Sequence, residues 1–169
     1  MMKLRQAPAG THSLQWRIDP AFDDYVRNRT GDGTVTLSGG ATRDDDGCYH
    51  FPGIAGAGDL ENLHYGGSVE FSAYLGVLSV RIAEPSLHLS SGMVHLYIVD
   101  DSAPAGTRLE LATASVEPGA KDDILLDLRL TERGAELFLG KYPAGTPLAP
   151  LSIFLGGPAA GQTGVEGAF

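Results

Sequence analysis

The sequence is short of cysteine and of positive charge. Its 169 residues include one cysteine, Cys48, so no disulfide can form within the chain. This excludes a small secreted domain that depends on disulfides for its stability. Lys and Arg number 12 against 21 Asp and Glu, which gives a formal net charge of −9. Because such a surface repels phosphate groups, we expect neither nucleic acid nor an anionic membrane as a partner.

Long apolar runs are also missing. No stretch approaches the roughly 18 consecutive apolar residues of a membrane-spanning helix, and the opening MMKLRQAPAGTHSLQW has no apolar signal segment. We therefore expect no membrane insertion and a cytoplasmic location. The composition divides the chain into a flexible N-terminus at 1–13, a single domain at 14–155 and a flexible Gly/Ala-rich tail at 156–169.

Glycine, by contrast, is abundant, and short alternating segments fill the chain. There are 23 Gly and 10 Pro, which implies many turns. Between them lie short runs of alternating apolar and polar residues, such as SLQW, SVEFSA and MVHLYIV, and this alternation is typical of strands with one buried face. The pattern predicts a mainly β fold, an antiparallel sandwich or barrel-like domain, with two short helices.

The first predicted helix is DPAFDDYVRN, residues 19–28. Asp19 is a good N-cap and Pro20 suits the first helical position. Phe22, Tyr25 and Val26 then share one face. From the residues alone, the buried face of an amphipathic helix is the favoured interpretation, and a ligand site at Tyr25 is the alternative. The second helix is predicted in TERGAELFLG.

Motifs for familiar chemistry are weak. No phosphate-binding loop or nucleophile elbow is present. Cys48 and His50 are two residues apart, which makes at best a weak zinc site, and the acidic run 44–46 lacks the ligand spacing of a calcium loop. His88 and His95 flank a predicted hairpin, where they would face each other. Surface or strand-edge positions are the favoured interpretation for the histidines, and a solvated hairpin tip is the favoured interpretation for the acidic run.

A series of motifs in a fixed order carries a resemblance over most of the chain. Trp16 in an opening strand is followed by FDDYV, GTVTLSGGATR, YHFPG, GSVEF, GVLSVRIAEP and KYPAGTPLAP. In this order they resemble the actinobacterial haem-uptake domain known as the Htaa domain. The resemblance runs from about Leu14 to Phe154 and implies a β-rich, sandwich-like domain with two short helices.

The resemblance also implies a haem site. The tyrosine that ligates haem iron in the family corresponds to Tyr25, and tyrosine is an established haem ligand. Phe22 would lie against the porphyrin, Tyr142 would line the pocket and Lys141 would meet a propionate. The family usually has a histidine where this chain has Tyr74. That departure leaves Tyr74 as a hydrogen-bond partner of Tyr25, as a ligand in its own right, or as a sign that haem binding has been lost.

A second function remains open on the sequence. The same pocket would suit a haem-independent enzyme of specialised metabolism that cyclises or isomerises a small apolar substrate, with tyrosines as general acids. Unpaired sheet edges would also permit a homodimer.

Overall fold

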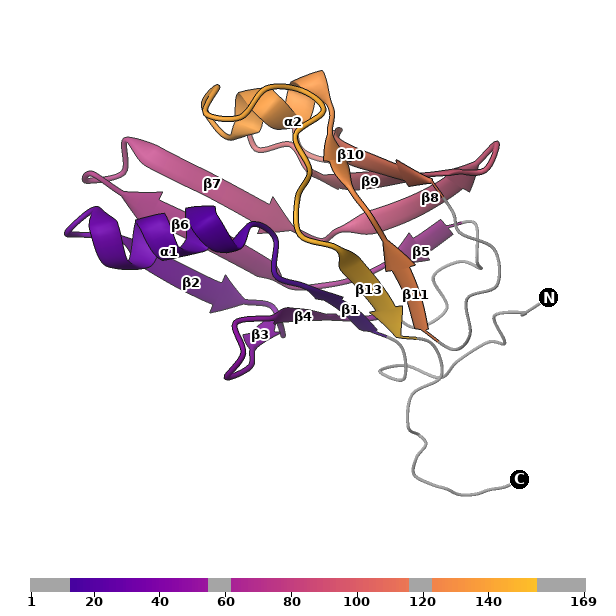
Figure 1. Ribbon diagram of the computed structural model, residues 1–169, viewed down its shortest axis with the longest axis horizontal. Coiled ribbons are helices and arrows are strands. Elements are labelled where there is room, and N and C mark those ends of the chain that lie inside the picture. The colour runs from indigo at the N-terminus through magenta and orange to yellow at the C-terminus, as the bar shows by residue number, and fades with distance from the viewer. Residues whose placement is uncertain (1–12, 55–61, 116–122, 155–169) are drawn as a thin grey trace.

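A computed structural model describes residues 13–54, 62–115 and 123–154 of the chain (Figure 1). The predicted flexible ends lie outside these residues, except for Ser13, which begins the first strand. The described residues form thirteen strands in three antiparallel sheets, together with two short helices. The predicted fold class is confirmed. No helix among the described residues is long and apolar enough to cross a membrane.

The first sheet joins the two ends of the domain. Its strand order is β11-β13-β1-β4-β3, so β1, the first strand, pairs with β13, the last, in the register Leu14↔Ile153. The strands are β11 (Asp123–Leu126), β13 (Leu151–Phe154), β1 (Ser13–Trp16), β4 (Tyr49–Pro52) and β3 (Thr42–Arg43).

The other two sheets are built largely from hairpins. The second has the order β12-β10-β9-β8-β5, and the third has the order β2-β6-β7. A hairpin between β8 and β9 turns at Ser91 and Gly92, as predicted. The strands of the second sheet are β12 (Arg129–Leu130), β10 (Arg108–Ser115), β9 (Met93–Val99), β8 (Ser86–Ser90) and β5 (Asn62–His64); those of the third are β2 (Thr34–Ser38), β6 (Ser68–Ala73) and β7 (Leu78–Ala83).

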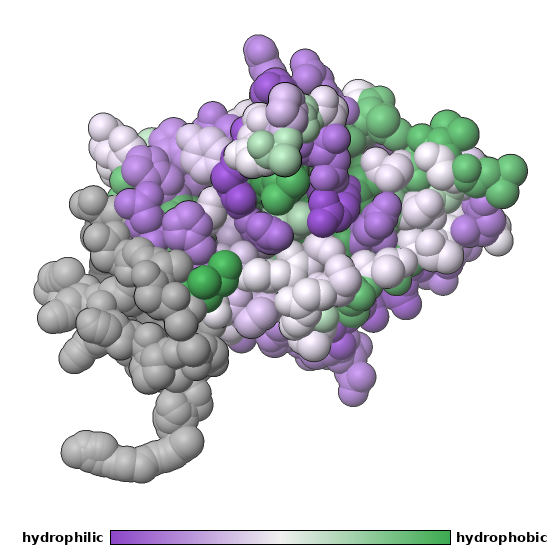
Figure 2. Space-filling model, turned by 180° about the vertical axis from the view of Figure 1, so that it is seen from behind, coloured by the Kyte–Doolittle hydropathy of each residue, from purple (hydrophilic) through white to green (hydrophobic). Residues whose placement is uncertain are grey.

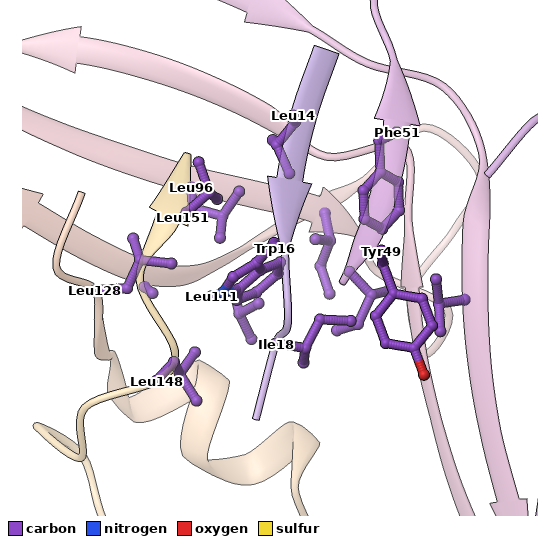
Figure 3. Packing of buried hydrophobic residues seen from close by; sticks show 14 of the residues in the cluster. Leu14, Trp16, Ile18, Tyr49, Phe51, Leu96, Leu111, Leu128, Leu148 and Leu151 are labelled. Carbon is purple, nitrogen blue, oxygen red and sulfur yellow. The ribbon is translucent and has the colours of Figure 1, made fainter. Parts of the chain in front are cut away.

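The core lies where the sheets and helices meet (Figure 3). Trp16 is fully buried, and its indole Nε1 donates a hydrogen bond to the carbonyl oxygen of Ala149 at 2.8 Å. Tyr49 and Phe51 extend the same core from β4, and both are fully buried. A buried indole with its polar atom satisfied fixes one packing arrangement, because any other would leave the N–H unpaired.

Both predicted helices are present. Helix α1 (Pro20–Arg29) lies against β2 and β6, and helix α2 (Glu132–Leu137) packs against β10 and β12. The Asp19 carboxylate accepts hydrogen bonds from two backbone N–H groups in the first turn of α1, and Thr131 caps α2 through the N–H of Gly134. At one end of the molecule the C-terminal end of α1 lies beside the β6–β7 turn (Figure 1).

Candidate functional site

Tyr25 projects from the edge of the buried face of α1. Phe22 and Val26 on that face are 1% and 0% exposed, whereas Tyr25 is half-buried and packs partly against the core. The three-and-four spacing of the helix thus gives two anchoring residues and one residue with an accessible hydroxyl. Phe22 and Val26 therefore pack in the core, whereas Tyr25 remains partly accessible to solvent.

Tyr74 meets Tyr25 from the β6–β7 turn. The two phenolic oxygens lie 2.5 Å apart, a short hydrogen bond in which either can donate. Tyr74 and Leu75 both have left-handed backbone, with φ of 55° and 57°. Residues with a side chain adopt this conformation at a cost, so the turn needs a compensating interaction.

Asp32 supplies that interaction. Its carboxylate accepts the backbone N–H of Tyr74 at 2.8 Å and that of Leu75 at 2.9 Å. These two donors lower the pKa of Asp32 below its usual range. Asp32 lies just after α1, the helix that contains Tyr25. Its hydrogen bonds therefore link the end of this helix to the β6–β7 turn, which contains Tyr74.

The two phenols lie between opposite charges. The Lys141 ammonium lies over the Tyr25 ring, 4.6 Å from its centroid, at a distance where a cation is attracted to the ring face. On the other side, the hydrogen bond to Tyr25 raises the pKa of Tyr74, and partial burial, the charge of Tyr25 and the Asp32 carboxylate add to the shift. Tyr74 therefore holds its proton firmly and is suited to donate it in a hydrogen bond.

Phe22 and Tyr142 are the other two predicted site residues, and both pack against Phe138. The Phe22 ring is in the core, edge-on to Phe71 and to Phe138, with both centroid distances 5.2 Å. Tyr142 is partly buried and packs edge-on against Phe138 at 5.6 Å. Burial and a hydrogen bond to the Asp19 carboxylate raise the pKa of Tyr142 to about 12. Phe138 thus contacts both rings, Phe22 from α1 and Tyr142 from the segment that follows α2.

The sequence analysis missed Asp32 and the exposed apolar residues nearby. Leu75 is 97% exposed, Val77 80% and Leu139 59%. Apolar surface gathers at the end of the molecule that carries the β6–β7 turn (Figure 2), although soluble proteins usually cover such side chains. Asp32 stands between two glycines at 31–33, a pattern that by itself indicates only a turn.

Two surface hollows lie away from Tyr25. One is lined largely by charged side chains, among them Arg17 between β1 and α1, Arg27 on α1 and Arg43 on β3. The other, of about 750 Å³, lies over β9, β10 and β12 and includes Met93 and Arg129. Neither hollow is lined by Tyr25, Tyr74 or Lys141.

The candidate metal ligands lie elsewhere in the fold. Ligand atoms of Asp44, Cys48 and His50 lie within 4.8 Å of one another at the β3–β4 turn. Asp44 serves that turn, however: one oxygen accepts the backbone N–H of Asp46 and of Cys48, and the other contacts His50 Nε2 at 2.9 Å. The hydrogen bond to His50 is the largest cause that lowers the pKa of Asp44 to about 2.

Solved structures share the fold. The C-terminal domain of HtaA from Corynebacterium glutamicum is 24% identical to this chain with a TM-score of 0.71, and the match covers 86% of this chain and 96% of that domain. The N-terminal domain of the same protein is 22% identical with a TM-score of 0.70, and the match covers 89% of this chain and 98% of that domain. The heme binding protein HtaB from the same organism is 19% identical with a TM-score of 0.70, over 87% of this chain and 92% of its own.

Sequence comparison gives the family directly. No curated protein matches the chain, but the family model described as Htaa matches residues 11–154. That range includes the whole described domain, with α1, the β6–β7 turn and Lys141. The chain is a member of the Htaa family.

Proposed function

We propose that this protein binds haem, with the phenolate oxygen of Tyr25 as the axial ligand of ferric iron. The observation that carries the proposal is the 2.5 Å contact between the Tyr25 and Tyr74 hydroxyls on an accessible surface. Membership of the Htaa family supports it, as does a fold shared with a protein described as heme binding. A phenolate is a hard anionic ligand that suits ferric iron, and tyrosine serves as a haem ligand in other proteins.

The residues around Tyr25 fit such a ligand. Tyr74 stands where the family usually has a histidine, and its hydroxyl can donate to the Tyr25 oxygen. Lys141 lies over the Tyr25 ring, so a positive charge is close to the proposed ligand. The exposed side chains of Leu75, Val77 and Leu139 offer apolar contacts of the kind that a porphyrin needs.

These residues have distinct roles in the proposal. Tyr25 supplies the ligand oxygen, and Tyr74 orients that oxygen and stabilises its charge. Asp32 holds Tyr74 in place through the turn. Lys141 either stabilises the phenolate or meets a propionate. Bound haem would supply a ferric iron, and the role of the protein would be to bind, store or pass on that group.

Titration with ferric haem, followed by absorbance, tests the proposal. We expect saturable binding with the spectrum of tyrosinate-bound ferric haem, and Tyr25→Phe should abolish that spectrum. Tyr74→Phe removes a hydrogen bond to the ligand, so affinity should fall about 10–100-fold. Tyr97→Phe, on β9, is the matched control and should bind like the native chain. A Tyr25→Phe variant with unchanged affinity and spectrum would refute the assignment.

The alternative of an enzyme for a small apolar substrate gains no specific support. The hollow beside α1 is lined by arginine and aspartate side chains, which would oppose an apolar molecule. A cytoplasmic location and a homodimer stay predictions. Fractionation of cells and light scattering of the purified protein would test them.

A further inference from the structure

A row of four polar side chains crosses the second sheet. The strands β5, β8, β9 and β10 are consecutive neighbours there, and each contributes one residue: Asn62, His88, His95 and Glu110 (Figure 1). The buried residues of β8 and β9, such as Leu87 and Leu96, alternate with the histidines. The row therefore lies on the outer face of the sheet, away from the core.

The two histidines are direct cross-strand partners. His88 pairs with His95 in the register of β8 and β9, and their ring centroids are 6.3 Å apart. Side chains at directly opposed positions of an antiparallel pair project side by side from the same face. Both rings are partly exposed, so a small ion in solvent can reach them.

The Nδ1 atom of each imidazole contacts an oxygen of a side chain on the neighbouring strand, β5 for His88 and β10 for His95. His95 Nδ1 lies 2.6 Å from a carboxylate oxygen of Glu110, and His88 Nδ1 lies 2.8 Å from the amide oxygen of Asn62. A carboxylate only accepts, and so does an amide oxygen, so both Nδ1 atoms carry hydrogen. A neutral ring then has its lone pair on Nε2.

This arrangement matches what a metal ion requires of histidine. Imidazoles that ligate metals usually donate the other ring N–H to a carboxylate, an amide or a carbonyl oxygen, which fixes the tautomer and raises ligand basicity. Here both rings have such a partner, and both partners lie on the flanking strands. Because the two nitrogens of imidazole point in divergent directions, the Nε2 edges turn away from the flanking strands.

We propose that His88 and His95 form a cross-strand site for a divalent transition-metal ion, with Nε2 of each ring as ligand and with Asn62 and Glu110 as the outer partners. Imidazole nitrogen suits Cu²⁺, Ni²⁺ and Zn²⁺, and the affinity order of these ions places Cu²⁺ highest. The site is separate from Tyr25 and does not depend on haem binding.

Copper titration of the purified chain tests the site. The background variant His12→Ala/Cys48→Ser/His50→Ala removes competing ligands outside the sheet. In this background we expect one bound Cu²⁺ per chain and an electron paramagnetic resonance spectrum with two nitrogen ligands. His88→Ala and His95→Ala should each weaken binding at least about tenfold, since changes to outer partners alone commonly cost 10–100-fold.

His64→Ala is the matched control, because His64 is an exposed histidine on β5 of the same sheet. We expect its Cu²⁺ affinity to stay within about twofold of the background, whereas Glu110→Ala, which keeps both rings, should weaken binding about 10–100-fold. Circular dichroism of each variant checks that the sheet is intact. Equal losses in His64→Ala and His88→Ala, or native affinity in His95→Ala, would overturn the proposal. Haem titration of His88→Ala should match the native chain whatever the copper result.

Discussion

The contact between Tyr49 and Asp23 gives the sharpest test of how α1 is held. Tyr49 is fully buried on β4, and its hydroxyl donates to Asp23 Oδ2 on α1 at 2.7 Å. Asp23 is only 6% exposed, and its other oxygen accepts no hydrogen bond among the described residues. Arg27 and Arg43 approach the carboxylate no closer than 3.7 and 4.0 Å. Tyr49 thus provides the one short hydrogen bond that this buried side chain makes.

Tyr49→Phe removes that bond and leaves a buried carboxylate poorly solvated. Hydrogen bonds to charged groups contribute about 1.5–3 kcal/mol, so we expect a loss of about 2 kcal/mol in the free energy of unfolding. For a chain of this size that corresponds to a fall of roughly 4–8 °C in Tm. Urea unfolding at neutral pH measures the change.

A double variant separates the hydrogen bond from other effects of the substitution. Replacing both partners, as in Tyr49→Phe/Asp23→Leu, removes the unsatisfied carboxylate as well as its donor, and such paired changes are often nearly neutral. The double variant should therefore lose less stability than the sum of the single variants. Strict additivity, or a Tyr49→Phe variant within 0.5 kcal/mol of the native chain by the same unfolding assay, would refute this account of the contact.

Three further predictions concern other parts of the domain. Gly134→Ala should cost about 3 kcal/mol in urea unfolding, because its Cβ would lie 2.2 Å from the backbone oxygen of Leu111. The phenol of Tyr142, with its pKa raised to about 12, should ionise well above the ordinary tyrosine value of about 10, and Tyr142→Phe should remove that late step from an absorbance titration. Since the folded pKa of Asp32 is lowered, its stabilising effect is present above the unfolded value of about 3.9 and is lost as pH falls through the folded value. Asp32→Asn should thus reduce stability at neutral pH but leave it unchanged well below pH 3, as acid unfolding curves would show.

Local patterns predicted the elements of this fold well, because each has its own chemical signal. The predicted N-cap Asp19 starts the first helix, and the second helix begins within TERGAELFLG as predicted, with Thr131 as its cap. The alternation in SVEFSA and MVHLYIV matches β6 and β9, and their buried faces follow it. These signals depend on near neighbours in the chain, so they can be read without knowledge of the tertiary structure.

The assignment of strands to sheets could not be predicted in the same way. TVTLSGGATR reads as one interrupted strand, yet β2 and β3 belong to different sheets, and the chain turns between them at Gly39 and Gly40 with φ of 66° and 97°. DILLDLRL likewise divides into β11 and β12, which join different sheets, while Leu126 and Leu128 are both buried where the chain crosses. A buried leucine can pack in either sheet, so the local sequence pattern does not determine which sheet the strand joins.

The site shows the same division between local and tertiary information. The helical spacing placed Tyr25 beside Phe22, but it did not say which of the two rings reaches the surface; the structure puts Phe22 at 1% exposure and leaves Tyr25 half-buried. Asp32 was missed because its partners, the N–H groups of Tyr74 and Leu75, are about forty residues away in the sequence. Contacts between residues so far apart in the sequence leave no periodic pattern from which they could be predicted.

The order of charges through the site gives a physical reason to assign the ligand to Tyr25 rather than Tyr74. The Asp32 carboxylate, the Tyr74 phenol, the Tyr25 phenol and the Lys141 ammonium follow one another through successive contacts. When the hydrogen-bonded pair of phenols loses one proton, the negative charge is favoured at the end nearer the cation and disfavoured at the end nearer the carboxylate. In the proposed haem complex Tyr74 would therefore be the donor, and Tyr25 would be the residue that binds the ferric ion. Tyr74, a phenol between the Asp32 carboxylate and a second phenol, would take that donor role without being a base itself.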